Sequence, residues 1–311
     1  MYSIKHQLKS SIVRVRRAVR MLTLDDKAEL EWLKKSVGPF PPGDFYSPIP
    51  DLEEIHRNEA AIWASPPQIL EGIDLNERGQ LKLLKRFRVF YKELPFSDRK
   101  SAALRYHFNN PAFSYSDAIM LYSMIRYAKP RRIIEIGSGF SSCVTLDTND
   151  LFFNGEIATT FIEPRPELFY SLIKRTDRKR VRVLPVRLQD VPLSEFDSLH
   201  RNDILFIDST HVSKIDSDIN HIFFQILPRL PKGVFVHFHD IFYPFEYPQQ
   251  WVYEGKVWNE AYMLRAFLTY NVAFKIIMFN TFMEGFHEDF FQKYMPLCLK
   301  NKGASIWLQK L

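Results

Sequence analysis

The sequence predicts an α/β fold: a seven-stranded, mostly parallel sheet with a C-terminal antiparallel hairpin and a mainly helical N-terminal cap. Three observations predict it. A short β-branched run at residues 133–136 ends at a Gly-x-Gly turn, and a helical pattern follows it. Further short apolar runs alternate with helical segments, a rhythm that indicates parallel strands. The chain ends in two strand-like runs with little helical signal after Tyr294, which indicates a hairpin.

The elements follow from the same patterns. Strands are expected at residues 132–136, 157–162, 181–184, 204–207, 233–238, 274–279 and 304–309. Helices are expected at residues 75–91, 116–127 and 258–269, where apolar side chains recur at helical spacing. Asp51 is expected to cap a short helix that begins at the next residue. We expect an N-terminal cap region at residues 1–112 and a ligand-binding sheet domain at residues 113–311.

Composition narrows the class of protein. The chain has 311 residues, of which 46% are hydrophobic and 25% charged, as in an ordinary globular protein. No apolar run is long enough to cross a bilayer, and no signal-like apolar segment follows the basic N-terminus. Two cysteines are too few for a disulfide framework. These features predict a cytoplasmic protein without a transmembrane segment.

The positive charge is concentrated at the N-terminus. The formal net charge is +6, and residues 1–20 contain six Lys or Arg and no acid. The rest of the chain is therefore close to neutral, which argues against a nucleic-acid-binding face. Residues 1–22 have apolar side chains at helical spacing, so we expect a docking helix for a partner or for the chain's own body. Contact with an anionic membrane surface is the alternative, and the pattern leaves room for a homo-oligomer.

The turn after the first strand predicts a ligand site. Gly137 and Gly139 let the backbone turn sharply and approach a ligand closely, and the helix that follows points free N–H groups at the same place. Glu135 adds a carboxylate two residues before the first glycine. That charge would repel a pyrophosphate but would tolerate a cationic ligand with a ribose.

Polar residues also stand where later strands end, and the carboxyl ends of strands are where open α/β sheets bind ligands. Glu163 follows the second strand and can accept both hydroxyls of a ribose. Asp208 follows the fourth strand, and His239 and Asp240 follow the fifth. These two strand ends are expected to be neighbours. Two carboxylates that converge there would repel each other unless a cation or a shared proton intervenes.

Catalysis is predicted for Asp208 and two histidines of the same region. A hydroxyl is a poor nucleophile while it keeps its proton, and a neutral imidazole within hydrogen-bond reach can remove that proton. His211, on the loop after the fourth strand, is the first candidate for this base, and His239 is the second.

The order Glu135-x-Gly137-x-Gly139, then Glu163, Asp208 and the terminal hairpin resembles class I S-adenosylmethionine-dependent methyltransferases, which have a Rossmann-like fold. Residues 45–51 and 239–248 look like those of the bacterial methyltransferase-24 and cephalosporin-hydroxylase-like group. The resemblance implies S-adenosylmethionine as cofactor and a hydroxyl of a sugar or small metabolite as acceptor.

The resemblance also implies which residues bind. The implied cofactor contacts are Glu135, Gly137, Ser138, Gly139, Glu163, Gln189, Asp190 and Asp208. A polar residue after the third strand binds the adenine in such proteins, and Asp190 is slightly favoured here over Gln189. Asp208, His239 and Asp240 resemble the metal triad of metal-dependent O-methyltransferases. Because one of the three is an imidazole, the set favours a transition metal, or no metal, over magnesium.

Two other functions remain open. One is an NAD-dependent oxidoreductase, although its fingerprint requires a small Gly or Ala where this chain has Ser142. The other is a non-catalytic binding module that kept the fold.

Overall fold

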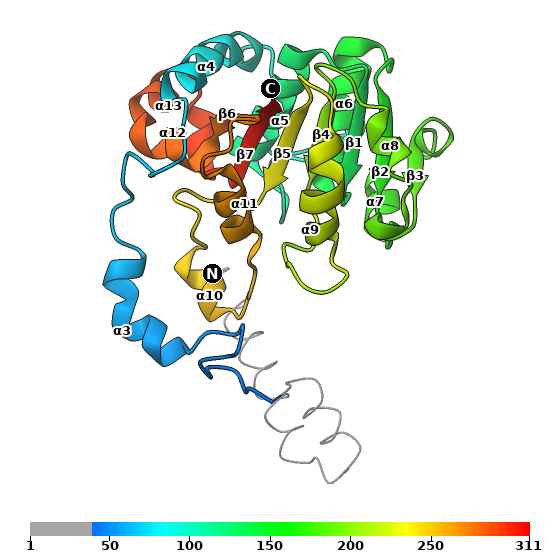
Figure 1. The fold of residues 1–311 in the computed structure, drawn as a ribbon. Coiled ribbons are helices and arrows are strands. Elements are labelled where there is room, and N and C mark those ends of the chain that lie inside the picture. Colours follow the sequence, from blue (N-terminus) through cyan, green and yellow to red (C-terminus); the bar gives the residue numbers. More distant parts are fainter. Residues whose placement is uncertain (1–38) are drawn as a thin grey trace. The chain divides into compact units, whose positions relative to one another are not determined.

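The structure, a computed structural model, describes residues 39–311. The chain divides into two compact units, one ending at Ala64 and one spanning Ser65–Leu311 (Figure 1). In the first unit, α3 spans Leu52–Ile62, and the Asp51 carboxylate accepts a hydrogen bond from the Glu53 N–H at 2.8 Å. The predicted role of Asp51 as the N-cap residue of this helix is thereby confirmed. The expected basic helix of residues 1–22 lies outside the described residues.

The second unit is built on one seven-stranded sheet, with strand order β3-β2-β1-β4-β5-β7-β6. The strands are β1 (Arg132–Ile136), β2 (Ala158–Ile162), β3 (Arg182–Leu184), β4 (Ile204–Ile207), β5 (Phe235–His239), β6 (Phe274–Phe279) and β7 (Ser305–Lys310). Strands β1 to β5 pair in parallel, and β7 runs antiparallel to both β5 and β6. The predicted fold class is confirmed.

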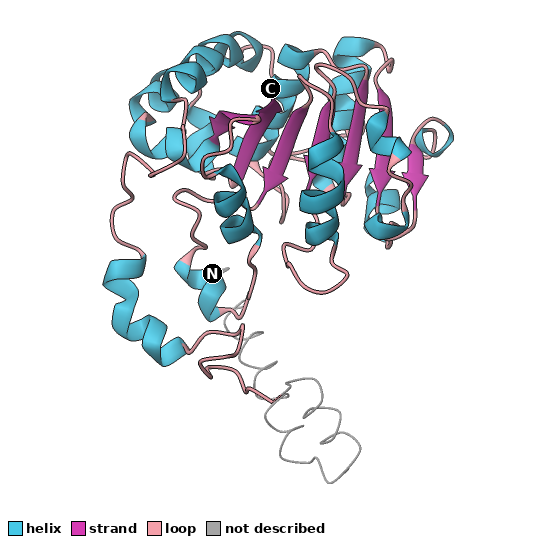
Figure 2. Cartoon of the chain, viewed as in Figure 1, coloured by secondary structure: helices cyan, strands magenta, loops and turns pink. Residues whose placement is uncertain are grey.

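Helices lie on both faces of the sheet (Figure 2). The α-helices of this unit are α4 (Glu77–Tyr91), α5 (Tyr115–Ala128), α6 (Phe140–Phe153), α7 (Glu167–Leu172), α8 (Ser194–Asp197), α9 (Asp218–His221), α10 (Gln249–Tyr253), α11 (Glu260–Leu268), α12 (Asn280–Phe286) and α13 (Glu288–Tyr294). A π-helical turn at Ile222–Ile226 continues α9. None of the helices within residues 39–311 is long and apolar enough to cross a membrane.

The connection between β6 and β7 differs from the expected loop. Helices α12 and α13 and a 3₁₀ turn at Pro296–Lys300 fill it. Their apolar side chains, including Phe282, Met283 and Phe291, are buried. The antiparallel pairing of β6 with β7 is nevertheless as predicted.

Residues 65–112 pack into the sheet unit, so the compact boundary lies earlier than the one expected after residue 112. Helix α4 buries Leu83, Leu84 and Phe87. The Gln80 side chain donates to the Leu75 carbonyl and accepts from the Phe279 N–H at the end of β6, both at 2.6 Å. A helix tied to the sheet by buried hydrogen bonds belongs to the same core. The separate cap and catalytic roles expected for residues 1–112 and 113–311 stay a prediction.

The topology fixes where a ligand binds. β1 lies between β2 and β4, and the strand order reverses there. At such a switch point the loops after the two neighbouring strands turn away from each other and leave a crevice at the carboxyl ends.

Candidate active site

The two glycines after β1 have different structural roles. Gly137 has φ +80°, and a Cβ placed on it would lie 1.9 Å from the Asp208 carbonyl oxygen. It therefore lets the loops after β1 and β4 pack directly against each other. Gly139 has φ −177°, an extended conformation open to any residue, and a Cβ there would meet nothing within 4 Å. The sharp turn predicted for both glycines is thus confirmed only at Gly137.

Glu135 is buried beneath this turn and holds the start of α6. Its Oε1 accepts hydrogen bonds from the Ser141 and Ser142 hydroxyls, each at 2.7 Å. Its Oε2 has no hydrogen-bond partner among the described residues. Burial raises the pKa of Glu135 to about 8, against the opposing effect of the two serine hydroxyls. Only Oε2 is left for a ligand or a water molecule.

A cavity of about 380 Å³ opens at the carboxyl ends of β1, β2 and β4. Four of the residues predicted to bind the cofactor line it: Gly137, Glu163, Gln189 and Asp208. Glu135, Ser138, Gly139 and Asp190 are not part of its lining. The walls also include apolar side chains of Ile136, Ile162 and Leu188.

Glu163 and Gln189 line this cavity from the loops after β2 and β3. The Glu163 carboxylate accepts from the backbone N–H of Arg165 at 2.8 Å and of Ser138 at 3.3 Å. Gln189 donates its side-chain amide to the Asp216 carbonyl at 2.5 Å. Asp190, the slightly favoured adenine contact, instead forms a bidentate ion pair with Arg187, with both distances 3.1 Å. The structure therefore favours Gln189 for that contact.

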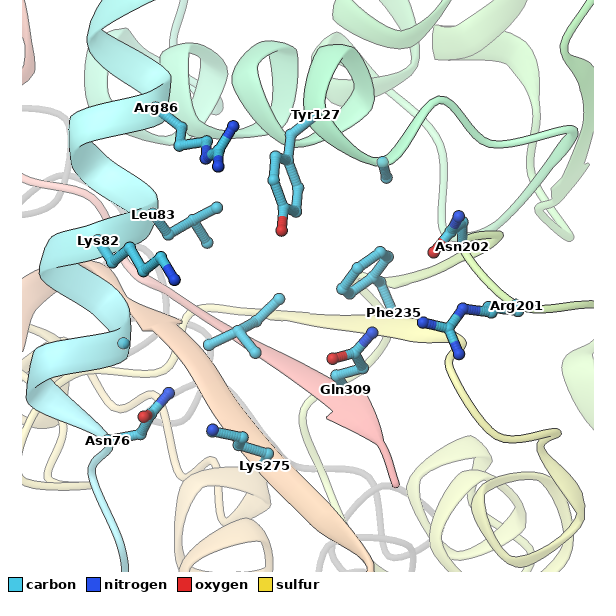
Figure 3. Close-up of a pocket in the computed structure, with 13 residues that line it drawn as sticks. Asn76, Lys82, Leu83, Arg86, Tyr127, Arg201, Asn202, Phe235, Lys275 and Gln309 are labelled. Carbon is cyan, nitrogen blue, oxygen red and sulfur yellow. The ribbon is translucent and has the colours of Figure 1, made fainter.

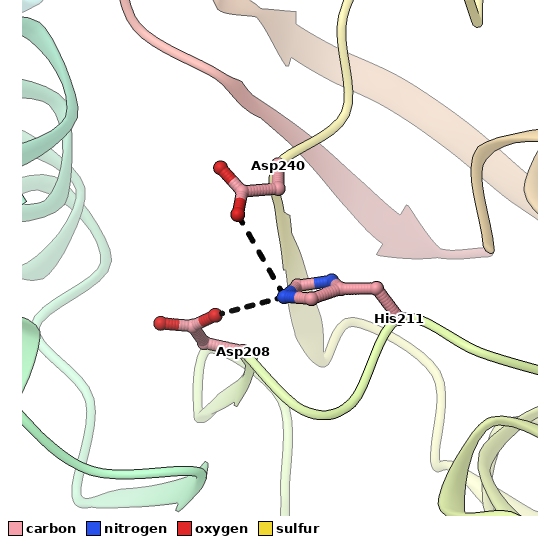
Figure 4. Close-up of side chains that lie close together, drawn as sticks. All are labelled: Asp208, His211 and Asp240. Atoms are coloured by element: carbon pink, nitrogen blue, oxygen red, sulfur yellow. Dashed lines mark ion pairs between the residues drawn. The ribbon is translucent and has the colours of Figure 1, made fainter. Parts of the chain in front are cut away.

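Beside the cavity, Asp208, His211 and Asp240 point their polar atoms at one another (Figure 4). One ligand atom from each lies within 4.8 Å of the others. The His211 Nε2 is 3.4 Å from Asp208 Oδ1 and 3.7 Å from Asp240 Oδ2. His211 and Asp240 both adopt left-handed backbone, with φ 60° and 56°. Such strain costs about 1–3 kcal/mol per residue and persists only where the surroundings impose it.

Glu260 holds His211 from behind. Its Oε2 lies 2.7 Å from His211 Nδ1, and its backbone N–H donates to the His211 carbonyl at 3.2 Å. Trp258 packs against the imidazole with ring centroids 4.3 Å apart. Glu260 is a site residue that the sequence did not reveal, because 49 residues separate it from His211. No spacing signal could have paired them.

The carboxylates around His211 favour its protonated form as long as no cation is bound beside it. Burial alone would lower its pKa, but the hydrogen bonds with Asp208 and Glu260 outweigh burial and raise the pKa to about 11. Burial raises the pKa of both Asp240 and Glu260. A protonated imidazole donates and cannot accept a proton, so the base role of His211 stays a prediction that requires prior loss of this proton.

Strand β5 carries two further buried histidines, His237 and His239. His239 has its Nε2 3.5 Å from Asp240 Oδ1 and no partner for Nδ1 among the described residues. His211 thus stands where the predicted metal set had His239. His237 stacks on Phe206 at 4.0 Å, and neither of its ring nitrogens has a hydrogen-bond partner among the described residues. Burial keeps its pKa well below the ordinary value.

Three polar side chains between residues 106 and 115 form hydrogen bonds with nearby parts of the chain. The Tyr106 hydroxyl donates to the Phe113 carbonyl at 2.7 Å, and the Tyr115 hydroxyl donates to Asp98 at 3.0 Å. Asn110 donates to the Phe113 carbonyl at 2.9 Å. None of the three lines the cavity after β1. Their polar tips stabilise the loop.

Comparison with known proteins agrees with this geometry. A model of a methyltransferase domain family, Methyltransf_24, matches residues 134–241. An uncharacterized protein of Archaeoglobus fulgidus is 39% identical over 179 residues, which cover 53% of this chain and 76% of the relative.

Solved structures with a similar course of the chain include three methyltransferases. The O-methyltransferase TomG of Streptomyces achromogenes, in complex with S-adenosylmethionine, is 17% identical with a TM-score of 0.45, covering 78% of this chain and 99% of its own. PaMTH1 of Podospora anserina is 12% identical at TM-score 0.42, with coverages of 83% and 96%. An O-methyltransferase of Bacillus cereus is 11% identical at TM-score 0.40, with coverages of 83% and 97%. Nothing about the acceptor follows at these levels of similarity.

A reversed strand order, a glycine turn after β1 and an acid after β2 define a class I methyltransferase, an enzyme class that uses S-adenosylmethionine as cofactor. Within that class, residues 134–241 of this chain match the methyltransferase-24 family of domains.

Proposed function

We propose that this enzyme transfers the methyl group of S-adenosylmethionine to a hydroxyl of a small metabolite, with a sugar or a glycosylated metabolite as the favoured acceptor. A cytoplasmic location belongs to the same proposal. One observation carries it: Asp208 both lines the cavity after β1 and faces His211 and Asp240. A methyl donor in the cavity would therefore end beside a cluster of polar groups suited to a hydroxyl.

The cavity offers a matching group for each part of the donor. The Glu163 carboxylate can accept hydrogen bonds from two ribose hydroxyls, and Gln189 can bind the adenine edge. The apolar walls suit the adenine faces. The open space at Gly139 lets the amino acid end of the donor approach the start of α6.

The polar groups of Asp208, His211 and Asp240 fit a divalent cation. Their donor set is two carboxylates and one imidazole, and Glu260 holds the second imidazole nitrogen at 2.7 Å, the usual support for a metal-bound histidine. A set with one nitrogen and two oxygen ligands suits a transition metal as well as magnesium. A bound cation there would lower the pKa of an acceptor hydroxyl.

The protein's own contribution is mainly alignment. The sulfonium already activates the methyl group, so the acceptor oxygen needs to be held in line with the carbon–sulfur bond. Such alignment of two bound reactants is worth about 7–11 kcal/mol at most. Asp240 and His211, held in left-handed backbone by Glu260 and the loop after β5, supply fixed partners on the acceptor side.

Calorimetry with S-adenosylhomocysteine tests the donor half of the proposal. Glu163→Gln should weaken binding about 10-fold or more, because a neutral amide accepts ribose hydroxyls less strongly than a carboxylate. Gln189→Ala should also weaken it. Asp190→Asn, whose carboxylate faces Arg187, is the matched control and should bind as the unchanged enzyme does. Equal affinities in all four proteins would refute the assignment.

Turnover with a panel of sugar and phenol acceptors tests the acceptor half. Asp240→Asn should lower kcat at least about 100-fold while leaving S-adenosylhomocysteine affinity within twofold, because Asp240 does not line the donor cavity. A chelator should lower the rate, and added Mn²⁺ or Mg²⁺ should restore it. Full activity of Asp240→Asn on every acceptor that reacts would exclude this cluster from the chemistry.

A further inference from the structure

A second cavity lies at the other end of the parallel strands. It measures about 600 Å³ and is bounded by α4, the end of α5, the loop before β4, the edge strand β6 and its neighbour β7. Its wall includes Phe235, the first residue of β5, and Arg201 just before β4. These are amino ends of parallel strands, so the cavity opens away from the methyl-transfer site. Nothing in the proposed reaction uses it.

Four cationic side chains surround this cavity: Lys82, Arg86, Arg201 and Lys275. Figure 3 shows Lys82 and Arg86 reaching in from α4, Lys275 from β6 and Arg201 from the opposite side. Lys82 and Arg86 are four residues apart on one helix and therefore share a face.

These charges have no anionic partner. Within residues 39–311, no Asp or Glu lines the cavity, and none of the four cations forms an ion pair. Some arginines elsewhere in the same residues are paired: the exposed Arg229 with Asp197 at 2.6 Å, and the partly buried Arg126 with Glu93 at 2.6 Å. Like charges gathered around one hollow repel each other, and a bound anion relieves that repulsion.

The cavity has the rest of a binding site as well. Tyr127 and Phe235 place two rings in its wall, with centroids 6.5 Å apart. The amides of Asn202 and Gln309 face the same space (Figure 3). A volume of about 600 Å³ exceeds what a single phosphate would fill. The lining therefore suits an extended anion with a flat or apolar part.

The basic surface continues beyond this cavity. An adjoining hollow of about 560 Å³ shares Arg201 and Asn202 and adds Lys129, Arg131 and Arg132. The one acid in its lining, Asp203, is occupied by the backbone N–H groups of Arg131 and Arg132, both at 2.9 Å, and of His200 at 2.8 Å. The Asp203 carboxylate therefore binds the backbone and does not pair with the cations of this hollow.

We propose that this surface binds a polyphosphate anion, such as a nucleoside triphosphate, at a site separate from methyl transfer. Lys and Arg bind phosphoryl oxygens through short charge-assisted hydrogen bonds, and cations on opposite sides of the hollow match phosphates joined in a chain. The rings and amides hold the organic part.

Calorimetry of the full chain with ATP and with inorganic tripolyphosphate, at about 0.1 M salt, tests the proposal. The double variant Lys82→Ala/Arg201→Ala should weaken both at least 10-fold. The control Lys85→Ala/Lys92→Ala removes two exposed charges from the same helix region that do not line the cavity, and it should stay within twofold. Lys82→Gln/Lys275→Gln is a second test pair that spares Arg201, should that change impair folding.

Three outcomes decide the matter. Saturable binding that only the cavity variants lose supports the proposal. Binding to vesicles with a polyphosphorylated lipid headgroup, lost in the same variants while free polyphosphates do not bind, supports it with the lipid as the source. No saturable binding to either form, or equal loss in the cavity and control variants, overturns it.

Discussion

At the residue scale, the two glycines of the turn after β1 separate folding from binding. Gly137→Ala should destabilise the enzyme by several kcal/mol, because its Cβ would meet the Asp208 carbonyl at 1.9 Å in a backbone that disfavours side chains. Gly139→Ala should change the free energy of unfolding by no more than about 0.5 kcal/mol. It should, however, weaken the binding of S-adenosylhomocysteine. Urea unfolding and calorimetry of both variants check this. Normal cofactor binding by Gly139→Ala would mean that the donor does not approach α6 there.

Glu260 is a positioning residue that acts through His211. Glu260→Gln should lower the affinity for a divalent metal about 10- to 100-fold, which is the usual cost of losing a carboxylate that supports a histidine ligand. Equilibrium dialysis with Mn²⁺ measures the change. Glu246→Gln, on the neighbouring aromatic loop and bonded to Tyr262, is the control. Unchanged metal affinity in Glu260→Gln, or an equal loss in the control, would contradict this role.

The sequence predicted the site best where a residue stands directly at a strand end. Glu163, Asp208 and Asp240 needed only the rule that parallel strands end at one edge. The burial of Glu135 could not be predicted, because it depends on Ser141 and Ser142, whose hydroxyls turn inward in the first turn of α6. The exchange of His211 for His239 depends on the left-handed backbone at both loops, which no local pattern reveals.

At the scale of elements, Arg105 joins the loop before α5 to α6 and to the turn before β3. Its guanidinium contacts Asp147 at 2.7 Å, Asp177 at 2.5 Å and Asp150 at 2.8 Å, and the first two acids are buried. Arg105→Ala would leave those carboxylates without their cation and should cost about 3–5 kcal/mol of unfolding free energy.

Urea unfolding measures that loss. The control is Arg178→Ala, an exposed side chain over the Tyr170 ring, which should cost no more than about 0.5 kcal/mol. A loss below 1 kcal/mol in Arg105→Ala would show that the network contributes little.

A buried acid between α12 and α5 makes stability depend on pH. Glu284 accepts hydrogen bonds from the Ser116 hydroxyl and from the Gly303 N–H at 3.0 Å. Burial raises the pKa of Glu284 to about 8 from an ordinary 4.5. The folded protein therefore keeps a proton that the unfolded chain releases, so the contribution is fully present below pH 4.5 and is lost as pH rises towards 8.

Glu284→Gln should flatten this fall in unfolding free energy, which is on the order of a few kcal/mol. Urea unfolding between pH 5 and 8 compares the variant with the unchanged enzyme and with the exposed Glu288→Gln. An identical slope in all three proteins would show that Glu284 is ionised in the folded state.

The strands were predictable to within about two residues because each is a short apolar run between turns. β1 and β4 have their expected bounds. β5 begins two residues later than expected, because Gly233 adopts φ +90° and belongs to the turn before the strand. Helices α12 and α13 were not predicted, because they are short and rich in phenylalanine. Aromatic runs of that length fit a loop packed on the core as well as a helix.

At the scale of the whole molecule, the sheet separates two kinds of surface. Its carboxyl edge holds the mixed acid and imidazole groups around Asp208. Its amino edge holds the unpaired cations around Arg201. The formal charge outside residues 1–20 is close to zero, so total charge predicted neither surface. The topology brings together residues that are distant in sequence, and it thereby places acidic groups at one edge of the sheet and basic groups at the other.

The most direct test is a crystal structure of the enzyme with S-adenosylhomocysteine and Mn²⁺. We predict the nucleoside in the cavity after β1, with ribose hydroxyls on Glu163, the sulfur on the side of Asp208, and the metal between Asp208, His211 and Asp240. A cavity left empty at saturating ligand, or a nucleoside bound elsewhere on the chain, would contradict the account.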